Sequence, residues 1–425
     1  MNDERKQRRF GRKAISVEEA RQAVLRHAEP VSIETLGLVD AVRRRAAEDV
    51  FAPEPVPHFR RSGMDGYAIR SGDTKDASSA NPVAFSVIDN IPCGTVPREA
   101  IVSGAAARIM TGAMVPDGAD AVVMLEMTEP RENGDETVIS VKRHIPSGAN
   151  VSAVGSDLMQ GEPVIRRGER LGPAEIAVLA AVGKPDVTVF RRPKVAILST
   201  GTELLAPGEP LQPGKIRNSN SYMLAAQTAN AGGEPAIIES VPDRLDIAAG
   251  TIRRLMETDD CDLLITTGGV SVGDYDMMTD FLYEWQGELL FNKIMMRPGS
   301  PTSAAVFNGK LLFALSGNPG ACFAGFELLV RPAIKKMQGA ADPGPASIKA
   351  VLDADFPKVN AYTRYIRGKR RVEDGSVFAA PVGEDRSSML VPGLGADCFI
   401  VIPPGGQGVA RGTLVDVLPF DDGKG

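Results

Sequence analysis

The sequence predicts a multidomain protein in which a doubly wound α/β region is combined with two strand-rich regions. Three observations predict this class. The 425 residues are enough for about three domains of ordinary size. Between residues 191 and 340, buried-strand patterns alternate with helical patterns, which indicates a mostly parallel sheet. Residues 60–142 and 346–420 contain short apolar runs separated by Gly, Pro and Asp turns, as is typical of small β domains.

The N-terminal region begins with a basic arm and a short helix. Lys and Arg are frequent in residues 5–13 but no apolar stretch follows, so we expect a disordered arm and not a signal peptide. A capping-box pattern at Ser16 predicts a helix over 16–29. A second helical segment is expected over 37–49. The prolines of residues 53–57 then predict a domain boundary.

The remaining elements follow from the spacing of apolar residues. Strands are expected at 82–88, 107–110 and 121–125, and then, after a helix at 171–183, at 194–199, 236–239, 262–267 and 310–315. The helices expected between and after the last four strands cover 218–231, 244–257, 274–285 and 320–337.

Composition argues against several classes of site. The net charge of −6 gives no general reason to expect nucleic acid or an anionic membrane as a partner, and no run approaches the ~20 apolar residues that span a bilayer. The four cysteines have no zinc-ribbon or redox spacing, which favours a reducing cytoplasm. With only three scattered histidines, a metal ion is better held by carboxylates, as magnesium is.

Ligands of doubly wound sheets bind beyond the carboxyl ends of the strands, and three expected strands end there in Gly-rich loops. In the loop 199–203, backbone amides could bind an anionic oxygen, Gly201 permits close approach and Glu203 could hold a metal. Taken alone, this loop is better explained as a plain strand-to-helix turn with a solvated glutamate.

The loop 266–276 is a stronger candidate, because it combines hydroxyls, three glycines and two acids directly after a strand. It could bind a phosphate or pyrophosphate, with Asp274 and Asp276 as magnesium ligands. The alternative for Asp274 is a helix N-cap. The loop matches neither a dinucleotide-binding fingerprint nor a P-loop.

Three further motifs are open to two interpretations. Lys293 and Arg297 lie four apart, and on a strand they would share a face that suits an oxyanion; the alternative is an exposed surface. Residues 316–320 form either an anion-binding turn or an ordinary helix start. Asp65 lies between Met and Gly, and its chemistry alone favours a turn.

Together these segments resemble the molybdopterin molybdenumtransferase family, which includes the C-terminal domain of gephyrin. The resemblance extends over about residues 16–420 and keeps the family's order of motifs. The matching segments are 64–70, 108–113, 118–123, 199–204, 267–273, 297–299 and 317–319.

The resemblance implies a fold and a domain organisation. The α/β region would be a three-layer α/β/α, molybdopterin-binding-like domain with a parallel-rich sheet, flanked by a strand-rich domain, a small mixed N-terminal domain and a C-terminal β-barrel-like domain. The implied ranges are a basic arm (1–15), domain I (16–57 and 143–190), domain II (58–142), domain III (191–340) and domain IV (341–425). The resemblance also implies a cytoplasmic homodimer whose active cleft includes parts of the partner subunit.

The implied reaction inserts molybdate into adenylylated molybdopterin and releases AMP, with Mg²⁺ or another divalent cation assisting. By resemblance, contacts with the molybdopterin adenylyltransferase and with downstream molybdoenzyme factors are also expected, but none with nucleic acid or membranes. The catalytic residues implied are Asp65, Glu203, Asp276 and Lys293, and the metal ligands are Glu203, Asp243 and Asp276. The substrate-binding residues implied are Thr111, Thr200, Gly201, Gly268, Gly269, Ser271, Gly273, Arg297, Ser316, Gly317, Asn318, Arg364 and Ser387.

The chain departs from the family's usual pattern near the expected oxyanion site. Arg297 and Ser300 stand where lysines are common, Ser316 replaces a proline and Ala321 replaces a serine. An arginine keeps the charge of a lysine but offers a planar fork of donors. Two alternatives stay open at this point: a molybdopterin adenylyltransferase, and a scaffold protein or paralogue of the family without turnover.

Overall fold

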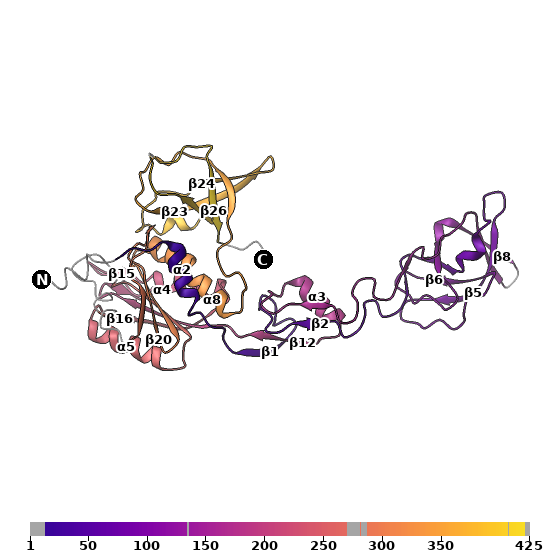
Figure 1. Cartoon of the computed structure of the whole chain (residues 1–425), viewed down its shortest axis with the longest axis horizontal. Coiled ribbons are helices and arrows are strands. Elements are labelled where there is room, and N and C mark those ends of the chain that lie inside the picture. Colours follow the sequence, from indigo (N-terminus) through magenta and orange to yellow (C-terminus); the bar gives the residue numbers. More distant parts are fainter. Residues whose placement is uncertain (1–12, 134–135, 270–280, 282–286, 407, 421–425) are drawn as a thin grey trace. The chain divides into compact units, whose positions relative to one another are not determined.

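The computed structural model describes residues 13–133, 136–269, 281, 287–406 and 408–420 (Figure 1). The chain forms two compact units. Unit 1 contains the chain up to Glu48, Arg167–Ala174, and the chain from Asp186 onward. Unit 2 contains Asp49–Arg166 and Glu175–Pro185. Each unit is described separately below.

A six-stranded sheet forms the centre of unit 1. Its strand order is β16 (Glu234–Val241), β13 (Lys194–Thr200), β17 (Leu263–Thr267), β21 (Lys310–Leu315), β20 (Ser303–Phe307) and β18 (Glu288–Phe291). The first four strands are mutually parallel, whereas β20 and β18 add antiparallel pairs at one edge. The carboxyl ends of the four parallel strands therefore meet at one end of the sheet.

Helices cover both faces of this sheet. Alternate side chains of β13 point to opposite faces: Val195 and Ile197 pack in one apolar core, and Ala196 and Leu198 in another. The helices of the first core are α2 (Val17–Leu25), α4 (Asn220–Asn230), α7 (Pro319–Gly325), a π-helical turn η3 (Phe326–Val330) and α8 (Arg331–Met337). The second core is covered by α5 (Leu245–Glu257). This arrangement is the expected three-layer α/β/α domain (Figure 1).

The C-terminal part of unit 1 is a closed five-stranded barrel. Its strands, in order of pairing, are β23 (Thr363–Glu373), β24 (Ser376–Pro381), β22 (Ile348–Leu352), β26 (Leu414–Pro419) and β25 (Cys398–Ile402). β25 pairs back onto β23, which closes the ring. The short strand β19 (Met296–Arg297) pairs in parallel with the start of β23. Closure removes free strand edges, and the interior is an apolar core of its own.

Two-stranded pairs complete unit 1. β1 (Ile33–Gly37) pairs with β12 (Asp186–Phe190), and β14 (Leu204–Leu205) pairs with β15 (Ile216–Arg217).

Unit 2 is strand-rich, as predicted. Its main sheet has the order β7 (Ala121–Met124), β4 (Gly66–Ile69), β6 (Ala105–Ile109), β5 (Val83–Ile91), β9 (Glu136–Val141) and β8 (Thr128–Asn133). Two small pairs join β3 (Arg61–Ser62) to β10 (Val151–Ser152), and β2 (Val50–Phe51) to β11 (Pro163–Ile165). Helix α3 (Pro173–Ala181) has most of its residues in unit 2.

The predicted helix over 37–49 is wrong. Residues 38–43 form turns after β1 instead. Arg43 has a φ of +68°, which a right-handed helix does not contain. Arg44 donates a hydrogen bond of 2.7 Å to the carbonyl of Phe190 in β12. Tertiary contacts thus override a composition that favours helix.

Of the two interpretations of Lys293 and Arg297, the shared strand face is not observed, because only Met296 and Arg297 are extended and Lys293 lies in the segment before them. The other expected strands, and the helices at 16–29, 171–183, 218–231, 244–257 and 320–337, are present with shifted ends. The expected helix at 274–285 falls, except for residue 281, outside the described residues.

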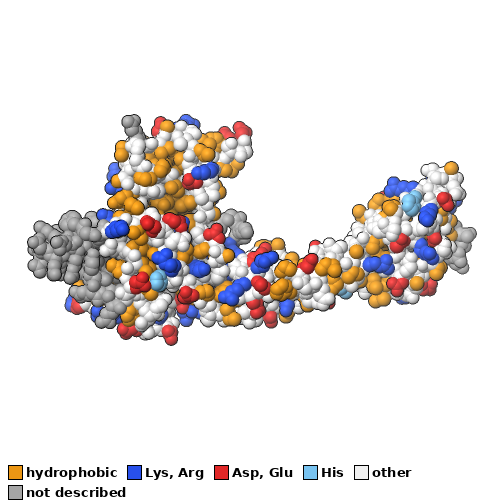
Figure 2. All heavy atoms as spheres, viewed as in Figure 1, with side chains coloured by type: hydrophobic (Ala, Val, Ile, Leu, Met, Phe, Trp, Pro, Cys, Tyr) orange, Lys and Arg blue, Asp and Glu red, His pale blue; other side chains and the backbone are white. Residues whose placement is uncertain are grey.

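Free cysteines, dispersed charge and helices of modest length characterise the described residues. All four cysteines are unpaired, and three of them are buried. Acidic and basic side chains are interspersed over the face shown in Figure 2. Among the described residues, no helix has the length and apolar character needed to cross a membrane.

One ion pair anchors the start of β13. Asp262 accepts two 2.6 Å hydrogen bonds from Arg191 and a 2.7 Å bond from the amide of Lys194. Burial alone would raise the pKa of the Asp262 carboxyl, but these hydrogen bonds outweigh burial and lower the pKa.

Asp262→Asn should therefore lower the free energy of unfolding at pH 7 by about 2 kcal/mol. A lowered folded-state pKa means that this stability is present above the ordinary aspartate pKa of about 4 and is lost as pH falls through the folded value. Urea titrations at pH 7 and pH 3 measure the effect. The exposed Arg244–Asp246 pair is the matched control, because the loss of a solvent-screened ion pair in Asp246→Asn should change the stability far less. Equal losses in both variants would contradict the prediction.

Candidate functional site

Three glycine loops converge where the parallel strands β13, β17 and β21 end. Gly268 has a φ of +96°, and a Cβ there would lie 2.2 Å from the carbonyl oxygen of Thr200. Such a contact is far inside van der Waals range, so only glycine lets the two loops touch. Gly317 lies against Gly268, since a Cβ on Gly317 would be 3.4 Å from the Gly268 Cα. The Gly201 amide donates a 3.2 Å bond to Val241 at the end of β16.

Two carboxylates lie close enough to influence each other at the same end of the sheet. Glu203 folds back over Gly201, where a Cβ would lie 2.7 Å from the glutamate Oε2. Asp243 follows β16, and burial together with the negative charge of Glu203 raises the pKa of its carboxyl. Beside them, the Thr200 side chain is 3 % exposed, and its hydroxyl has no hydrogen-bond partner among the described residues. The edge thus combines mutually repelling acids with an unsatisfied hydroxyl.

Asn220, at the start of helix α4, links two of these loops by hydrogen bonds. The Asn220 amide donates 2.9 Å bonds to the Thr267 hydroxyl and to the carbonyl of Gly317, which ties two loops together. The Thr267 hydroxyl in turn donates to the carbonyl of Ser316 at 3.1 Å. The Oδ1 of Asn220 is buried without a partner in the described part of the chain, so an acceptor is available at the loop junction.

A second polar cluster is centred on Asn218, two residues before Asn220. The side-chain nitrogen of Asn218 lies 2.8–3.0 Å from the hydroxyls of Ser199, Ser221 and Ser240, which share its two N–H donors. Ser199 and Ser240 belong to the neighbouring strands β13 and β16. Because buried polar groups are costly unless paired, this cluster holds the two strand ends in a fixed register.

The beginning of helix α7 is a second polar junction in unit 1. Asn318 is its N-cap residue, and the Asn318 amide donates a 3.2 Å bond to the Ser316 hydroxyl. The Gly320 amide donates a 2.8 Å bond to the carbonyl of Ser387. Arg367 of β23 lies beside Gly320, since a Cβ on that glycine would be 3.5 Å from the guanidinium carbon.

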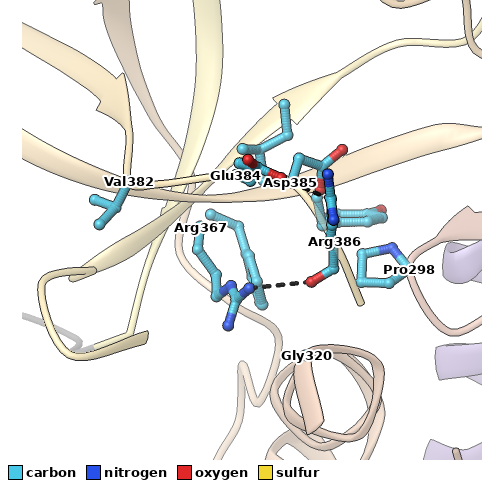
Figure 3. A pocket seen from close by; sticks show the side chains of 10 residues that line it. Pro298, Gly320, Arg367, Val382, Glu384, Asp385 and Arg386 are labelled. Atoms are coloured by element: carbon cyan, nitrogen blue, oxygen red, sulfur yellow. Dashed lines mark hydrogen bonds and ion pairs between the residues drawn. The ribbon is translucent and has the colours of Figure 1, made fainter. Parts of the chain in front are cut away.

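A small cavity of about 10 Å³ lies at this place, with Pro298, Gly320, Arg367 and Arg386 in its wall (Figure 3). The Arg367 guanidinium donates to the carbonyls of Met389 at 2.8 Å and Arg386 at 3.4 Å. Burial lowers the pKa of this guanidinium, which nearby Asp385 partly offsets. A half-buried arginine at a helix start is suited to bind a small anion.

Arg297 and Arg364 are register partners in the β19–β23 pair. Arg364 is bonded within the barrel: it donates 2.6 Å to the Oδ1 of Asn360 and forms an ion pair with Asp385. Arg297 is exposed and precedes a cis peptide bond to Pro298. The structure thus engages Arg364 in an internal network, whereas Arg367 faces the helix start.

In unit 2, Asp65 and Thr111 are brought together. The Oδ1 of Asp65 accepts 2.7 Å and 2.8 Å hydrogen bonds from the Thr111 amide and hydroxyl. These bonds, the amide bond first, lower the pKa of the Asp65 carboxyl. Asp65 is exposed, and the strand β4 begins directly after it. Both residues of this pair were expected at the site from the resemblance.

The structure places the remaining residues expected at the site as follows. The structure brings together Thr200, Gly201, Glu203, Asp243, Gly268, Ser316 and Gly317 at the strand ends. Asn318 and Ser387 meet around the start of α7. Gly269 follows Gly268 with a φ of +63°. The expected residues Ser271, Gly273 and Asp276 lie outside the described residues, as does Asp274.

Sequence reasoning missed Asn218, Asn220 and Arg367. The first two belong to a polar run, Asn-Ser-Asn-Ser, at the expected helix start, which was available as a signal for buried polar contacts. Nothing in the local pattern separates Arg367 from Arg364, because only the pairing of β23 decides which arginine faces α7.

Comparisons with known proteins cover nearly the whole chain. Three family models match: the MoeA N-terminal region (domain I and II) at residues 15–183, a probable molybdopterin binding domain at 196–336, and the MoeA C-terminal region (domain IV) at 349–420. The molybdopterin molybdenumtransferase of Bacillus subtilis (strain 168) is 42% identical over 414 residues, 97% of this chain and 96% of that protein. The corresponding protein of Staphylococcus aureus (strain COL) is 40% identical over 407 residues, 96% of each chain.

A solved structure shows the same fold. The molybdopterin biosynthesis MoeA protein of Pyrococcus horikoshii OT3 superimposes with a TM-score of 0.82 at 32% identity, covering 96% of this chain and 100% of that one.

Proposed function

Because the chain belongs to the MoeA family of molybdopterin molybdenumtransferases, we propose that it inserts molybdate into adenylylated molybdopterin and releases AMP. The observation that carries the proposal is the convergence of three glycine loops beside Glu203 and Asp243 at the strand ends. The pyrophosphate of the adenylylated substrate needs backbone amides at close range, and the glycines allow that approach. The loops supply this without side chains in the way.

Glu203 and Asp243 fit a divalent cation such as Mg²⁺. Each carboxylate is an oxygen ligand of the type that Mg²⁺ prefers. Burial first, and then the charge of Glu203, raise the pKa of Asp243, and a cation between the two acids would relieve the second effect. Asp276 is proposed as a third ligand by resemblance. When bound, the cation would neutralise charge on the phosphates as AMP leaves. Glu203 and Asp243 would hold it, and the Thr200 hydroxyl would bind a phosphate oxygen or a ligand water.

Molybdate is proposed to bind at the start of helix α7. Arg367 and the turn at Ser387 lie at that point, and the Arg367 guanidinium supplies the positive charge. Lys293 and Arg297 remain proposed as further cations for this substrate. Arg364 would act indirectly, through its ion pair with Asp385, by positioning the loop that carries Ser387.

The test is a single-turnover assay with purified protein, adenylylated molybdopterin, Mg²⁺ and molybdate. We expect AMP release that depends on molybdate and on Mg²⁺. An AMP-release rate that does not change when molybdate is added would refute the proposal. A parallel reaction with ATP and molybdopterin checks for adenylylation, which would instead identify an adenylyltransferase.

The Asp65–Thr111 pair yields a prediction within unit 2. Because two hydrogen bonds hold Asp65 ionised, Asp65→Asn should remove a charge while keeping the turn, and should lower the rate of AMP release about 100-fold. Thr111→Val removes only the hydroxyl bond and should cost about tenfold. Thermal unfolding should change by only a few degrees in either variant. Asp76→Asn, at an exposed aspartate of the same unit, is the matched control and should be fully active. Full activity of Asp65→Asn would exclude Asp65 from the site.

We also propose a cytoplasmic homodimer. The unpaired cysteines, of which Cys93 is exposed, are compatible with a reducing compartment. The β1 region carries apolar side chains that suit a subunit contact: Ile33 is 60% and Val39 is 83% exposed. Sedimentation equilibrium measures the assembly state, and a monomer at micromolar concentration would contradict this part of the proposal.

A further inference from the structure

A large cavity of unit 1 lies at the other end of the sheet from the strand-end loops. Its volume is about 670 Å³, within the range of small-molecule sites. It is lined by Arg192, which precedes β13, by the C-terminal end of α4 at residues 227–232, by the helical segment from Phe323 to Gln338, and by the barrel. We call this cavity the basic cleft.

The charge of the basic cleft is strongly positive, although the whole chain has a net charge of −6. One wall carries the three arginines of residues 43–45 together with Arg170 and Arg192. Arg331, Lys335 and Arg370 add to it from the helical segment and the barrel. The concentration of like charge in a concave, partly desolvated space favours an anionic ligand.

The two acids that line the basic cleft are bonded to other cations, and within the arginine wall Arg44 is paired with Glu34. The two acids are Glu327 and Asp397, which are bonded to Arg331 at 2.5 Å and to Arg370 at 3.4 Å. Within the described residues, neither Arg43 nor Arg192 has a side-chain ion pair. Arginine forks bind phosphate oxygens in pairs, so a wall of this kind suits a ligand with more than one phosphoryl group.

Buried polar groups show that the basic cleft is built into the fold. Lys335 is 7% and Arg44 is 8% exposed, which is rare for these residue types. Gln227, at 4% exposed, lines the cleft, and its amide donates a 2.7 Å bond to Glu327. The Oε1 of Gln227 has no partner among the described residues and therefore lacks a donor. A ligand hydroxyl or amino group would supply one.

The remaining features indicate the shape of the ligand. Phe323 and Phe420 pack edge to face, with ring centroids 5.0 Å apart, and form an apolar part of the wall. Arg43 is held at a φ of +68° by a 2.8 Å bond from its amide to the carbonyl of Leu171. Non-glycine residues rarely adopt this conformation, and where it persists the surrounding structure fixes it, often beside a ligand.

We propose that the basic cleft is a second ligand site, which binds a nucleoside polyphosphate separately from the strand-end loops. The arginine wall binds the phosphates, the Gln227 Oε1 accepts a hydrogen bond from a sugar hydroxyl or base amine, and the aromatic pair contacts the base. The proposal uses none of the residues assigned to catalysis, so it stands or falls separately from the proposed function.

The test is calorimetric titration of the full chain with ADP in the presence of EDTA. We expect an ADP-binding event that weakens with added salt. The double variant Arg43→Asn/Arg192→Ala should raise the Kd of this event about 10- to 100-fold. Asparagine tolerates the positive φ at position 43. Arg253→Ala, at an exposed arginine of α5 outside the cleft, is the matched control and should bind as the wild type does.

A second variant separates the two sites. Gly268→Ala alters the strand-end loops. It should bind ADP with the wild-type Kd, whereas the double variant binds ADP more weakly. Circular dichroism and thermal unfolding confirm that each variant is folded. Unchanged ADP binding in the double variant would overturn the proposal. A titration with hexaglutamate is the second control. If hexaglutamate binds and ADP does not, the proposal is overturned and an acidic protein partner is indicated. A double variant that changes the sedimentation coefficient without affecting ADP would overturn the proposal too, as evidence for a subunit contact.

Discussion

Gly268→Ala should lower the rate of molybdate-dependent AMP release about 100-fold, because a displacement of about 1 Å in a positioning loop has that effect. A methyl group at this position would lie 2.2 Å from the carbonyl oxygen of Thr200. The loop after β17 must then move away from the loop after β13. The proposed pyrophosphate-binding amides move with it, so substrate binding and turnover both suffer.

The same substitution should also reduce stability. A side chain in the left-handed region costs about 1–2 kcal/mol, apart from any contact. Gly309 separates the two effects: it has a φ of +76°, yet a Cβ there would meet no atom within 4 Å. Gly309→Ala should therefore lose stability by conformational strain alone and keep full activity. Single-turnover rates and urea titrations of both variants measure the difference. If Gly268→Ala behaved like Gly309→Ala in both measurements, the strand-end loops would not be the site.

Glu203→Gln is expected to have the next largest effect. Removing one of the two neighbouring carboxylates should raise the Mg²⁺ concentration for half-maximal AMP release about tenfold or more, since affinity for hard cations follows the number of charged oxygen ligands. The side chain keeps its size, so the close contact with Gly201 remains. Titration of the rate with Mg²⁺ measures the effect. Glu257→Gln, at an exposed glutamate ending α5, is the control and should have no effect.

The pH dependence of the same variant follows from Asp243. In the wild type, burial and Glu203 raise the pKa of Asp243, so its carboxyl takes up a proton at a higher pH than an ordinary aspartate. Mg²⁺ affinity should fall as the pH is lowered through that raised value. Without the Glu203 charge, the pKa of Asp243 should drop and the loss of affinity should move to lower pH. Carbon-13 NMR of the aspartate carboxyls reports the pKa directly. No change in either the pKa or the Mg²⁺ dependence would contradict the pairing of these acids.

Stability should respond in the opposite direction to activity. An acid whose pKa is raised in the folded state opposes folding as pH rises through that value. Asp243→Asn should therefore leave the protein as stable as the wild type or more stable at pH 7, while weakening Mg²⁺ binding. A gain in stability at the expense of ligand binding is typical when a functional carboxylate is removed.

Local patterns predict the strands and loops of the α/β domain because the apolar composition of a segment and its periodicity are local properties of the sequence. The runs before Gly201, Gly268 and Ser316 are buried strands, and each ends in its expected loop. Which loops touch is a different question. The contact between Gly268 and Thr200 depends on β13 and β17 being neighbours, and the sequence specifies that order only through the assembled core.

Long-range contacts explain the failures as well. Residues 37–49 contain good helix formers, yet Arg44 is used to bind the carbonyl of Phe190, 146 residues away, and Arg43 takes a left-handed conformation. Similarly, the residue type alone does not predict which of Arg364 and Arg367 lies beside the start of α7. The ion pair of Arg364 with Asp385 engages the first, and the approach of Gly320 to the second decides which arginine faces α7.

The asparagine at position 218 has a consequence for how relatives of this chain diverge. Hydroxyls from β13, β16 and α4 share one amide, and Ser199 and Ser240 also bond to each other, so changing either of these two serines to alanine leaves the other without that bond. Ser199, Ser221, Ser240 and Asn218 should accordingly be inherited as a set or replaced together by an apolar set, and homologues with a half-replaced cluster should be scarce.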